Sequence, residues 1–211
     1  MSNPIYNPRI FDHADLLSAR QIVLTPENGV ATDVRWQTET PWLLNIIEKY
    51  VKPSSLIVDY GCGVGRLSAP LAISGHSVIG VDTSESMRQH ATMQVSNERF
   101  VAMTPVMFDQ FVKIGVRADI VLAIWMLQHT FDLHCEVERI CNSMKKGASL
   151  VVADMIHRAI PTNKGWVSDG LSVKEVVSSK LTLVQQYPYN PPNAPIGLKD
   201  TSYVCVFRKD K

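Results

Sequence analysis

The segment Val58-Asp59-Tyr60-Gly61-Cys62-Gly63-Val64-Gly65 decides the fold that we predict for this chain. An apolar run at residues 56–58 leads into it, and a helical stretch follows it, which is the context of a ligand-cradling glycine turn. Glycines let the backbone turn sharply and bring bare amide groups against a ligand. The segment therefore predicts a binding site directly after the first strand of a sheet.

Outward from this turn, short apolar runs alternate with helical stretches, which predicts a parallel sheet covered on both faces. Helices are expected at residues 64–74, 84–93, 106–114, 133–144 and 167–179, and another at 41–51 with Thr40 as its cap and Pro41 in its first turn. Seven strands are expected, at residues 56–58, 77–81, 99–103, 118–124, 149–153, 181–186 and 202–207. Ligands of such sheets bind beyond the carboxyl ends of the strands.

The length of 211 residues favours one domain. Residues 1–38 are polar and irregular, and we expect an N-terminal extension that can act as a lid, followed by a single domain over residues 39–211. With 45% hydrophobic and 19% charged residues, the composition is that of a globular protein rather than a disordered or coiled-coil chain. The longest apolar run, at residues 120–127, is far short of the roughly 20 residues that span a bilayer.

The net charge indicates which binding partners to expect, and the spacing of the cysteines indicates the cellular compartment. Lys and Arg number 21 against 20 Asp and Glu, so nothing predicts a surface for nucleic acid or membrane. The N-terminus lacks the pattern of a signal peptide and the cysteines show no CxxC, so we expect free thiols and a cytoplasmic protein. We expect no metal, because His134 and Cys135 would need two further ligands supplied by folding.

The glycine spacing separates two kinds of nucleotide cofactor. A dinucleotide fingerprint is GxGxxG, which would need a third glycine where this chain has Arg66. Here the third glycine comes early, at Gly65, and Asp59 stands two residues before the turn. Asp82 ends the next predicted strand, where a carboxylate can accept two hydrogen bonds from a ribose diol.

This arrangement resembles motif I of the class I S-adenosylmethionine-dependent methyltransferases. Asp82 corresponds to that family's acidic residue after the second strand, and residues 118–121 with Leu127-Gln128-His129 resemble its fourth-strand segment. The resemblance implies an α/β fold with a doubly wound, mostly parallel seven-stranded sheet whose last strand is antiparallel. It also implies S-adenosylmethionine lying across the ends of the first, second and fourth strands.

The predicted cofactor site departs from the family at one point. The loop after the third strand often carries an acid near the adenine amino group, whereas here Thr104 or a backbone group has to substitute. Met87 and Met103 either pack on the adenine faces or belong to the core. The predicted cofactor-binding residues are Asp59, Gly61, Cys62, Gly63, Asp82, Thr83, Met87, Met103, Thr104, Ile124, Trp125 and Arg35.

The sequence says less about which residues surround the reacting methyl group and the acceptor. His129 follows the fourth strand and is either a general base, because imidazole titrates near neutrality, or a hydrogen-bonded structural residue. Tyr189, on the loop between the last two strands, is the second candidate for that role. Arg35 either meets the methionine carboxylate of the cofactor or lies on the surface, and Trp125 lines either the cofactor or the acceptor.

The function that these features predict is methyl transfer to a small-molecule acceptor. Two other classes remain open at this point: a lyase or cyclase that uses S-adenosylmethionine without moving its methyl group, and a module that binds it without turnover. The oligomeric state is not predicted by the sequence.

Overall fold

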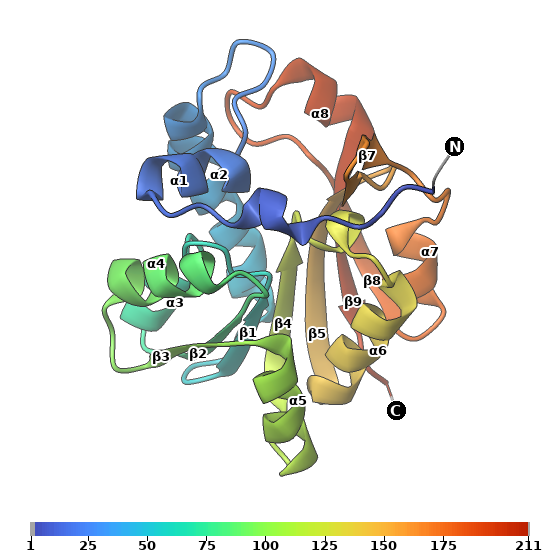
Figure 1. Ribbon diagram of the computed structural model, residues 1–211. Helices are drawn as coiled ribbons and strands as arrows, with labels where there is room; N and C mark the ends of the chain where they lie inside the picture. Colours follow the sequence, from blue (N-terminus) through green and yellow to red (C-terminus); the bar gives the residue numbers. More distant parts are fainter. Residues whose placement is uncertain (1–2, 211) are drawn as a thin grey trace.

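The computed structural model describes residues 3–210, and its centre is a seven-stranded sheet in the order β3-β2-β1-β4-β5-β9-β8 (Figure 1). β9 runs antiparallel to both of its neighbours, β5 and β8, and the other pairs are parallel. The predicted doubly wound sheet with an antiparallel last strand is therefore confirmed. The strands of the sheet are β1 (Leu56–Tyr60), β2 (Ser77–Val81), β3 (Phe100–Met103), β4 (Ala118–Ile124), β5 (Met144–Met155), β8 (Thr182–Pro188) and β9 (Ser202–Arg208).

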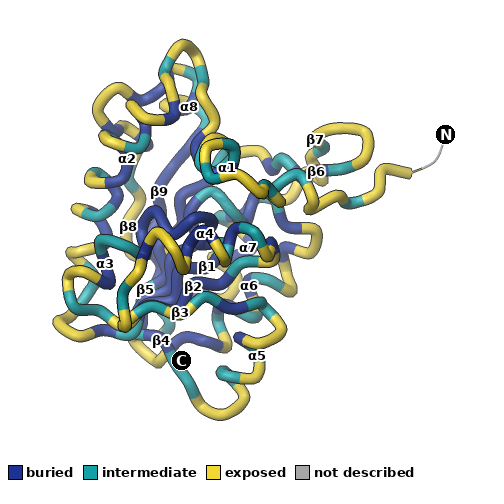
Figure 2. The backbone as a smooth tube through the Cα atoms, turned by 60° about the vertical axis from the view of Figure 1, so that its left-hand side comes forward, coloured by how far each residue is buried: buried dark blue, intermediate teal, exposed yellow. Residues whose placement is uncertain are grey.

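Helices cover both faces of the sheet because successive side chains of each strand point to opposite sides. Ile57 belongs to the core shared with α2 (Thr32–Ile47) and α3 (Ser68–Ile73). Val58 belongs to the core shared with α5 (Pro105–Lys113), α6 (Leu133–Ser143) and α7 (Val173–Ser178). Figure 2 shows the central strands as the most buried part of the chain. The remaining helices are α4 (Glu85–Val95) and α8 (Ile196–Thr201).

Side-chain caps fix the starts of three helices that follow the strands. Ser84 accepts a hydrogen bond from the Met87 amide at 3.1 Å, and Thr104 accepts one from Met107 at the same distance. Asp132 caps α6 in the same way. Each cap satisfies an amide that the first turn leaves without a partner, so these helices begin close to where the sequence predicts.

The N-terminal prediction is wrong in detail. Residues before 39 are not irregular: they form η1 (Pro8–Phe11), α1 (Leu16–Val23) and the first two turns of α2. α2 begins at Thr32, so Thr40 is not its cap and Pro41 lies inside the helix. The helix extends upstream because its first turns bury Arg35 and Glu39, which form an ion pair at 2.9 Å.

Three further segments differ from the prediction. Residues 64–67 are not helical, because the glycine turn continues through Gly65 at a φ of +83°. The expected helix at 167–179 is only α7, and a hairpin of β6 (Ile160–Thr162) and β7 (Gly165–Val167) precedes it. α8 occupies part of the loop before β9, and η2 (Glu48–Tyr50) and η3 (Leu127–His129) are short 3₁₀ turns. Elements of three to six residues show too little periodicity to be recognised in a sequence.

Within residues 3–210, no helix combines the length and the apolar character that crossing a membrane requires.

Candidate active site

A cavity of about 810 Å³ opens at the carboxyl ends of the central strands. Tyr60 and Gly61 line it from the end of β1, Asp82 from the end of β2, and Trp125 and Met155 from the ends of β4 and β5. This is the edge at which ligands of doubly wound sheets bind. The site prediction and the cavity therefore coincide in position.

The glycine turn is packed so closely that side chains would not fit. Gly61 and Gly63 have φ values of +79° and +53°, in the left-handed region. A Cβ atom on Gly61 would come within 2.6 Å of the Met126 side chain, and one on Gly63 within 2.8 Å of Val23 in α1. Both glycines line the cavity, so the turn presents bare backbone to a ligand.

Asp82 holds the glycine turn and faces the cavity at the same time. One of its carboxylate oxygens accepts a hydrogen bond from the Gly63 amide and the other from the Ser84 amide, both at 2.9 Å. Burial raises the pKa of Asp82, although these amide hydrogen bonds act in the opposite direction. Each oxygen has a further lone pair, and Thr83 and Met87 line the cavity beside it. This set is suited to two hydroxyl donors next to a flat apolar group.

A buried ionic cluster closes the opposite side of the turn. The Glu39 carboxylate accepts hydrogen bonds from Arg35 at 2.9 Å, from Arg66 at 3.3 Å and from the Trp125 indole at 2.7 Å. It also accepts one from the Tyr189 hydroxyl. Because two guanidinium groups share this one carboxylate, the cluster carries an excess of positive charge.

Arg35 is the charged member of this cluster that lines the cavity. Its guanidinium also donates to the Thr25 carbonyl at 2.8 Å, and its side chain is only 4% exposed. Among residues 3–210, its buried Nε finds no hydrogen-bond partner. A buried donor without a partner is rare in proteins, and here it fits an anionic group of a ligand.

Trp125 reaches Glu39 only through a strained backbone. Its φ is +58°, which is unfavourable for any residue with a Cβ atom. The Trp125 amide donates to the Ala153 carbonyl at 2.7 Å, and its indole bond to Glu39 fixes the side chain. Ile124 and Trp125 both line the cavity, and strain of this kind concentrates at functional sites.

His129 lines the cavity in one defined tautomer. Its Nδ1 lies 2.6 Å from the Ala159 carbonyl, so Nδ1 carries the proton and donates. Its Nε2 lies 3.0 Å from the amide nitrogen of Gln128, whose oxygen accepts from the Met155 amide at 3.0 Å. Nε2 therefore accepts, and burial lowers the pKa of His129. The imidazole is neutral, and the Gln128 amide covers its one basic atom.

Five of the predicted site residues do not line the cavity. Asp59 is buried and accepts from the Ser68 hydroxyl at 2.6 Å, and burial raises its pKa to about 6. Met103 is a core residue, and Thr104 is the cap of α5. Cys62 is buried in the turn with its amide bonded to Val81, and Tyr189, 1% exposed, is held by Glu39. The structure thus separates these residues from direct contact with a ligand in the cavity.

The N-terminal segment runs across the ends of the central strands (Figure 1), where Tyr6 and Phe11 line the cavity, and hydrogen bonds hold it on both sides. On one side, the Asn7 amide donates to the Pro161 carbonyl in β6 at 2.9 Å. On the other, Asp12 accepts hydrogen bonds from Ser84 at 2.8 Å and from Ser86 at 2.6 Å, at the start of α4. No periodic pattern of residues in this segment predicts these contacts.

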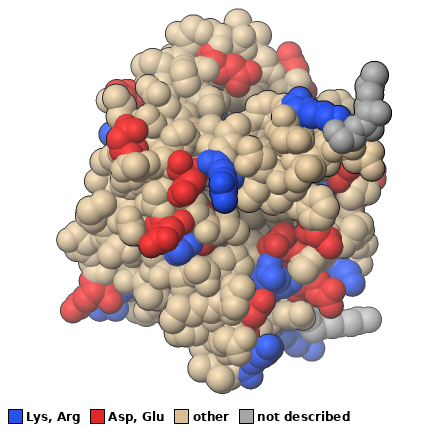
Figure 3. Space-filling model, viewed as in Figure 1, with Lys and Arg blue, Asp and Glu red and all other residues tan. Residues whose placement is uncertain are grey.

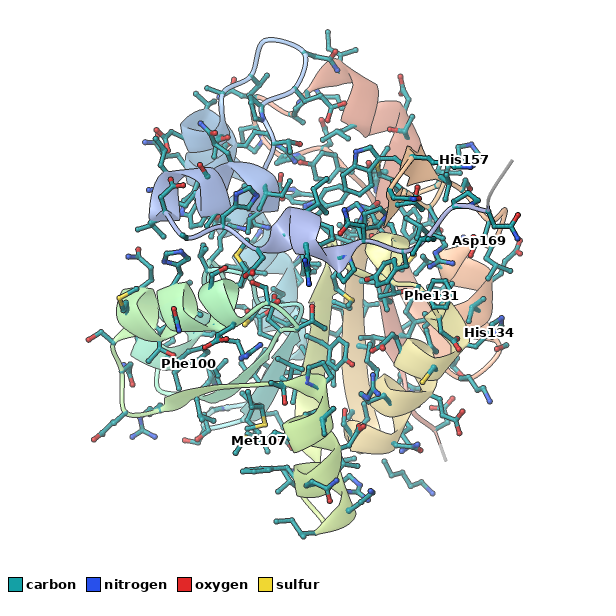
Figure 4. The ribbon with its side chains drawn as sticks, viewed as in Figure 1. Phe100, Met107, Phe131, His134, His157 and Asp169 are labelled. Carbon is teal, nitrogen blue, oxygen red and sulfur yellow. The ribbon has the colours of Figure 1, made fainter. Side chains whose placement is uncertain are left out.

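Aromatic side chains that the sequence analysis missed form one end of the cavity wall. Phe11 and Trp166 pack on His129 with ring centroids 5.4 and 5.2 Å apart, and Tyr6 packs on Phe131 at 5.4 Å. Figure 4 shows Phe131 on the loop beside η3, on the side of the molecule away from Phe100. Single aromatic residues in short irregular segments carry no pattern that would identify them.

Within residues 3–210, no group of three or more His, Cys, Asp or Glu side chains is placed to hold a metal ion. The cysteines are free thiols, two of them buried, at Cys62, Cys135, Cys141 and Cys205.

A glycine turn after β1, a carboxylate after β2 and a cavity over the central strand ends define the class I methyltransferase architecture. The chain belongs to the methyltransferase domain family, whose model matches residues 40–189.

Relatives and solved structures agree with this assignment. A ubiquinone biosynthesis O-methyltransferase of Bradyrhizobium diazoefficiens is 30% identical over 117 residues, which are 56% of this chain and 44% of that protein. The chain thus spans less than half the length of such curated relatives. A Haloferax volcanii methyltransferase solved with the Trm112 methyltransferase activator has a TM-score of 0.64 at 15% identity, with 85% and 92% of the two chains covered. The N-methyltransferase NodS from Bradyrhizobium japonicum has a TM-score of 0.63 at 14% identity, with 82% and 95% covered.

Proposed function

We propose that this chain binds S-adenosylmethionine in the cavity and transfers its methyl group, in line, to a small-molecule acceptor. One observation carries the proposal: the bare glycine turn, Asp82 and the cationic side chain of Arg35 all line one cavity. The glycine turn offers backbone contact, Asp82 can accept hydrogen bonds from a diol, and Arg35 can donate hydrogen bonds to a carboxylate.

Each end of the cofactor has a matching group in this proposal. Asp82 accepts the two ribose hydroxyls, and Arg35 receives the methionine carboxylate. Thr83 and Met87 contact the adenine, since Met103 and Thr104 do not line the cavity. Asp59, Cys62 and Tyr189 act indirectly, by holding the turn and the ionic cluster in shape.

The chemistry then depends mainly on alignment. S-adenosylmethionine supplies a methyl group already activated by the sulfonium charge. Holding two reactants in line contributes roughly 7–11 kcal/mol to a barrier reduction. Proton removal by His129 would first require Gln128 to leave Nε2, so the geometry favours His129 as a fixed wall rather than as the base.

The size and charge of the site support a small acceptor. The volume of about 810 Å³ lies within the range of roughly 300–1,000 Å³ of ligand pockets. Figure 3 shows small groups of both charges on the face in view, without a continuous basic area of the kind that binds nucleic acid. The sequence relatives are named for a step in making ubiquinone, a small molecule.

We also propose that the N-terminal segment is a lid. α2 runs through the predicted boundary at residue 38, so the lid comprises the residues before Thr32. Its ties to the β6–β7 hairpin and to α4 close the cavity from the solvent side. Opening then requires release of the Asp12 contacts with Ser84 and Ser86.

Calorimetry and product analysis test the proposal. Asp82→Ala removes both diol acceptors, so we expect the Kd for S-adenosylhomocysteine to rise on the order of 100-fold. Glu138→Ala, at an exposed carboxylate of α6, is the matched control and should leave Kd unchanged. Tighter binding of NAD than of either adenosyl compound would refute the cofactor assignment.

Mass spectrometry of the cofactor product separates the remaining functions. S-adenosylhomocysteine shows methyl transfer, whereas methylthioadenosine shows cleavage at another carbon. Binding with no product, across a broad panel of small acceptors, would leave a binding module instead.

A further inference from the structure

We propose that the acceptor is an uncharged molecule with a planar aromatic ring, bound against an aromatic wall of the cavity. This inference rests on the proposed function, because it assigns the part of the cavity that the cofactor does not need. We call Phe11, His129 and Trp166, together with Tyr6 and Phe131, the aromatic wall.

The wall is assembled from segments that lie far apart in the chain. Phe11 belongs to η1, His129 to η3 and Trp166 to β7, and all three line the cavity. Their ring centroids are 5.2 to 6.2 Å apart, with planes tilted by 48° to 57°. Such tilted contacts are favourable between aromatic rings, so the three side chains form one continuous surface.

This surface remains accessible. The Trp166 side chain is 48% exposed and that of Phe131 is 68% exposed. Contiguous exposed aromatic groups within a cavity mark a binding surface rather than a core. The three rings pack directly on one another, so an incoming ring extends an existing set of aromatic contacts.

The position of the wall relative to the strands assigns it to the acceptor. The diol acceptors and the glycine turn lie after β1 and β2, whereas His129 and Ala159 lie beyond β4 and β5. In-line transfer places the acceptor on the far side of the methyl group from the cofactor body. The region beyond β4 and β5 is the rest of the same cavity.

The charges near the wall disfavour an anion. Among the described lining residues, Arg35 is the one Lys or Arg side chain, and it belongs to the ionic cluster at the glycine turn. Arg158 lies behind the wall, but its side chain is fully buried and paired with Asp169. The carboxylates of Glu136 and Asp132 also line the cavity and would repel an acidic acceptor.

Glu136 is not free to hold a cation. Both of its oxygens accept from Arg139 at 2.7 Å, and the Tyr60 hydroxyl donates to one of them. Asp132 accepts from the Cys135 amide at the start of α6 and keeps its charge there. The rings of the wall itself carry no charge, so their apolar faces suit an uncharged ring.

Pairs of small molecules, each an aromatic compound and its saturated counterpart, test the inference. They are titrated into the full chain saturated with S-adenosylhomocysteine. The probes are phenol against cyclohexanol and catechol against trans-1,2-cyclohexanediol, with benzoate and benzylamine as charged rings. We expect each aromatic member to bind at least tenfold more tightly than its saturated partner in titrations followed by NMR. Benzoate and benzylamine should bind no more tightly than phenol.

Variants connect this preference to the wall. Trp166→Leu and Phe11→Leu should reduce the aromatic preference to less than threefold. For Trp166→Leu, which leaves the N-terminal segment unchanged, the Kd for S-adenosylhomocysteine should change less than twofold. Phe100→Leu, on the edge strand β3 and away from the wall, is the matched control and should keep the preference (Figure 4).

Several outcomes overturn the proposal. Equal binding of cyclohexanol and phenol, tighter binding of a charged ring, or no binding of any aromatic probe up to 10 mM would each do so. Failure of S-adenosylhomocysteine to bind would instead contradict the proposed function, and the two failures are therefore distinguishable.

Discussion

Replacing Glu39 by Gln tests the ionic cluster on which the cofactor end of the cavity depends. Glu39 is 1% exposed and accepts hydrogen bonds from Arg35, Arg66, Trp125 and Tyr189. Glutamine keeps the shape but removes the charge, and its amide group points at least one donor at another donor. Two buried guanidinium groups then share no carboxylate at this position.

The expected loss is large because the cluster is buried. Removing one partner of a buried ion pair costs about 3–5 kcal/mol. For a chain of this size, each kcal/mol lowers Tm by roughly 2–4 °C, so a fall of about 6–20 °C is expected. Urea unfolding and differential scanning calorimetry at pH 7 measure both quantities. Glu48→Gln, at an exposed carboxylate just after α2, is the control and should be nearly neutral.

The pH dependence gives an independent check. Burial alone would raise the pKa of Glu39, but the charges of Arg66 and Arg35 outweigh it and lower the pKa below its ordinary value of 4.5. The stabilisation by the carboxylate is therefore complete above pH 4.5 and is lost as the pH falls through the lower native pKa. The difference between wild type and Glu39→Gln should shrink under acid. A loss of less than about 1 kcal/mol at pH 7 would refute the reasoning.

Three further changes have defined outcomes. Burial raises the pKa of Asp59 from 3.8 to about 6, so ionisation of Asp59 destabilises the folded state as the pH rises from 4 to 6. The Asp59→Asn variant should therefore have a free energy of unfolding higher than that of the wild type by up to about 3 kcal/mol at pH 7 and equal to it near pH 4. Urea unfolding at both pH values checks this, and an equal difference at both would contradict it. Asp12→Ala should speed dissociation of S-adenosylhomocysteine on the order of tenfold in stopped-flow measurements, with Glu138→Ala, at an exposed carboxylate of α6, as the control. His129→Ala should lower turnover less than tenfold, whereas loss of a general base would cost about 10²–10⁴-fold.

Local backbone chemistry explains what could be predicted. The glycine turn needs left-handed φ values at Gly61 and Gly63, and Asp82 sits at the end of the next strand, so both features are visible in a few consecutive residues. The alternation of apolar runs with helical stretches likewise predicts the sheet and most of its helices. The wrong predictions of secondary structure concern short elements, such as the β6–β7 hairpin, and the start of α2, which depends on a buried ion pair.

Long-range contacts explain what could not be predicted. Arg35 meets Tyr189, and Phe11 meets Trp166, across most of the chain, and no local pattern encodes such meetings. The tautomer of His129 depends on Gln128 and on the Ala159 carbonyl, which the fold brings together. The sequence by itself thus determined the sheet and the glycine turn, and predicted the class of cofactor, because these follow from local conformation. Only the tertiary structure decided the ionic cluster, the path of the N-terminal segment and the aromatic wall, because each depends on side chains whose packing is fixed only when distant segments fold together.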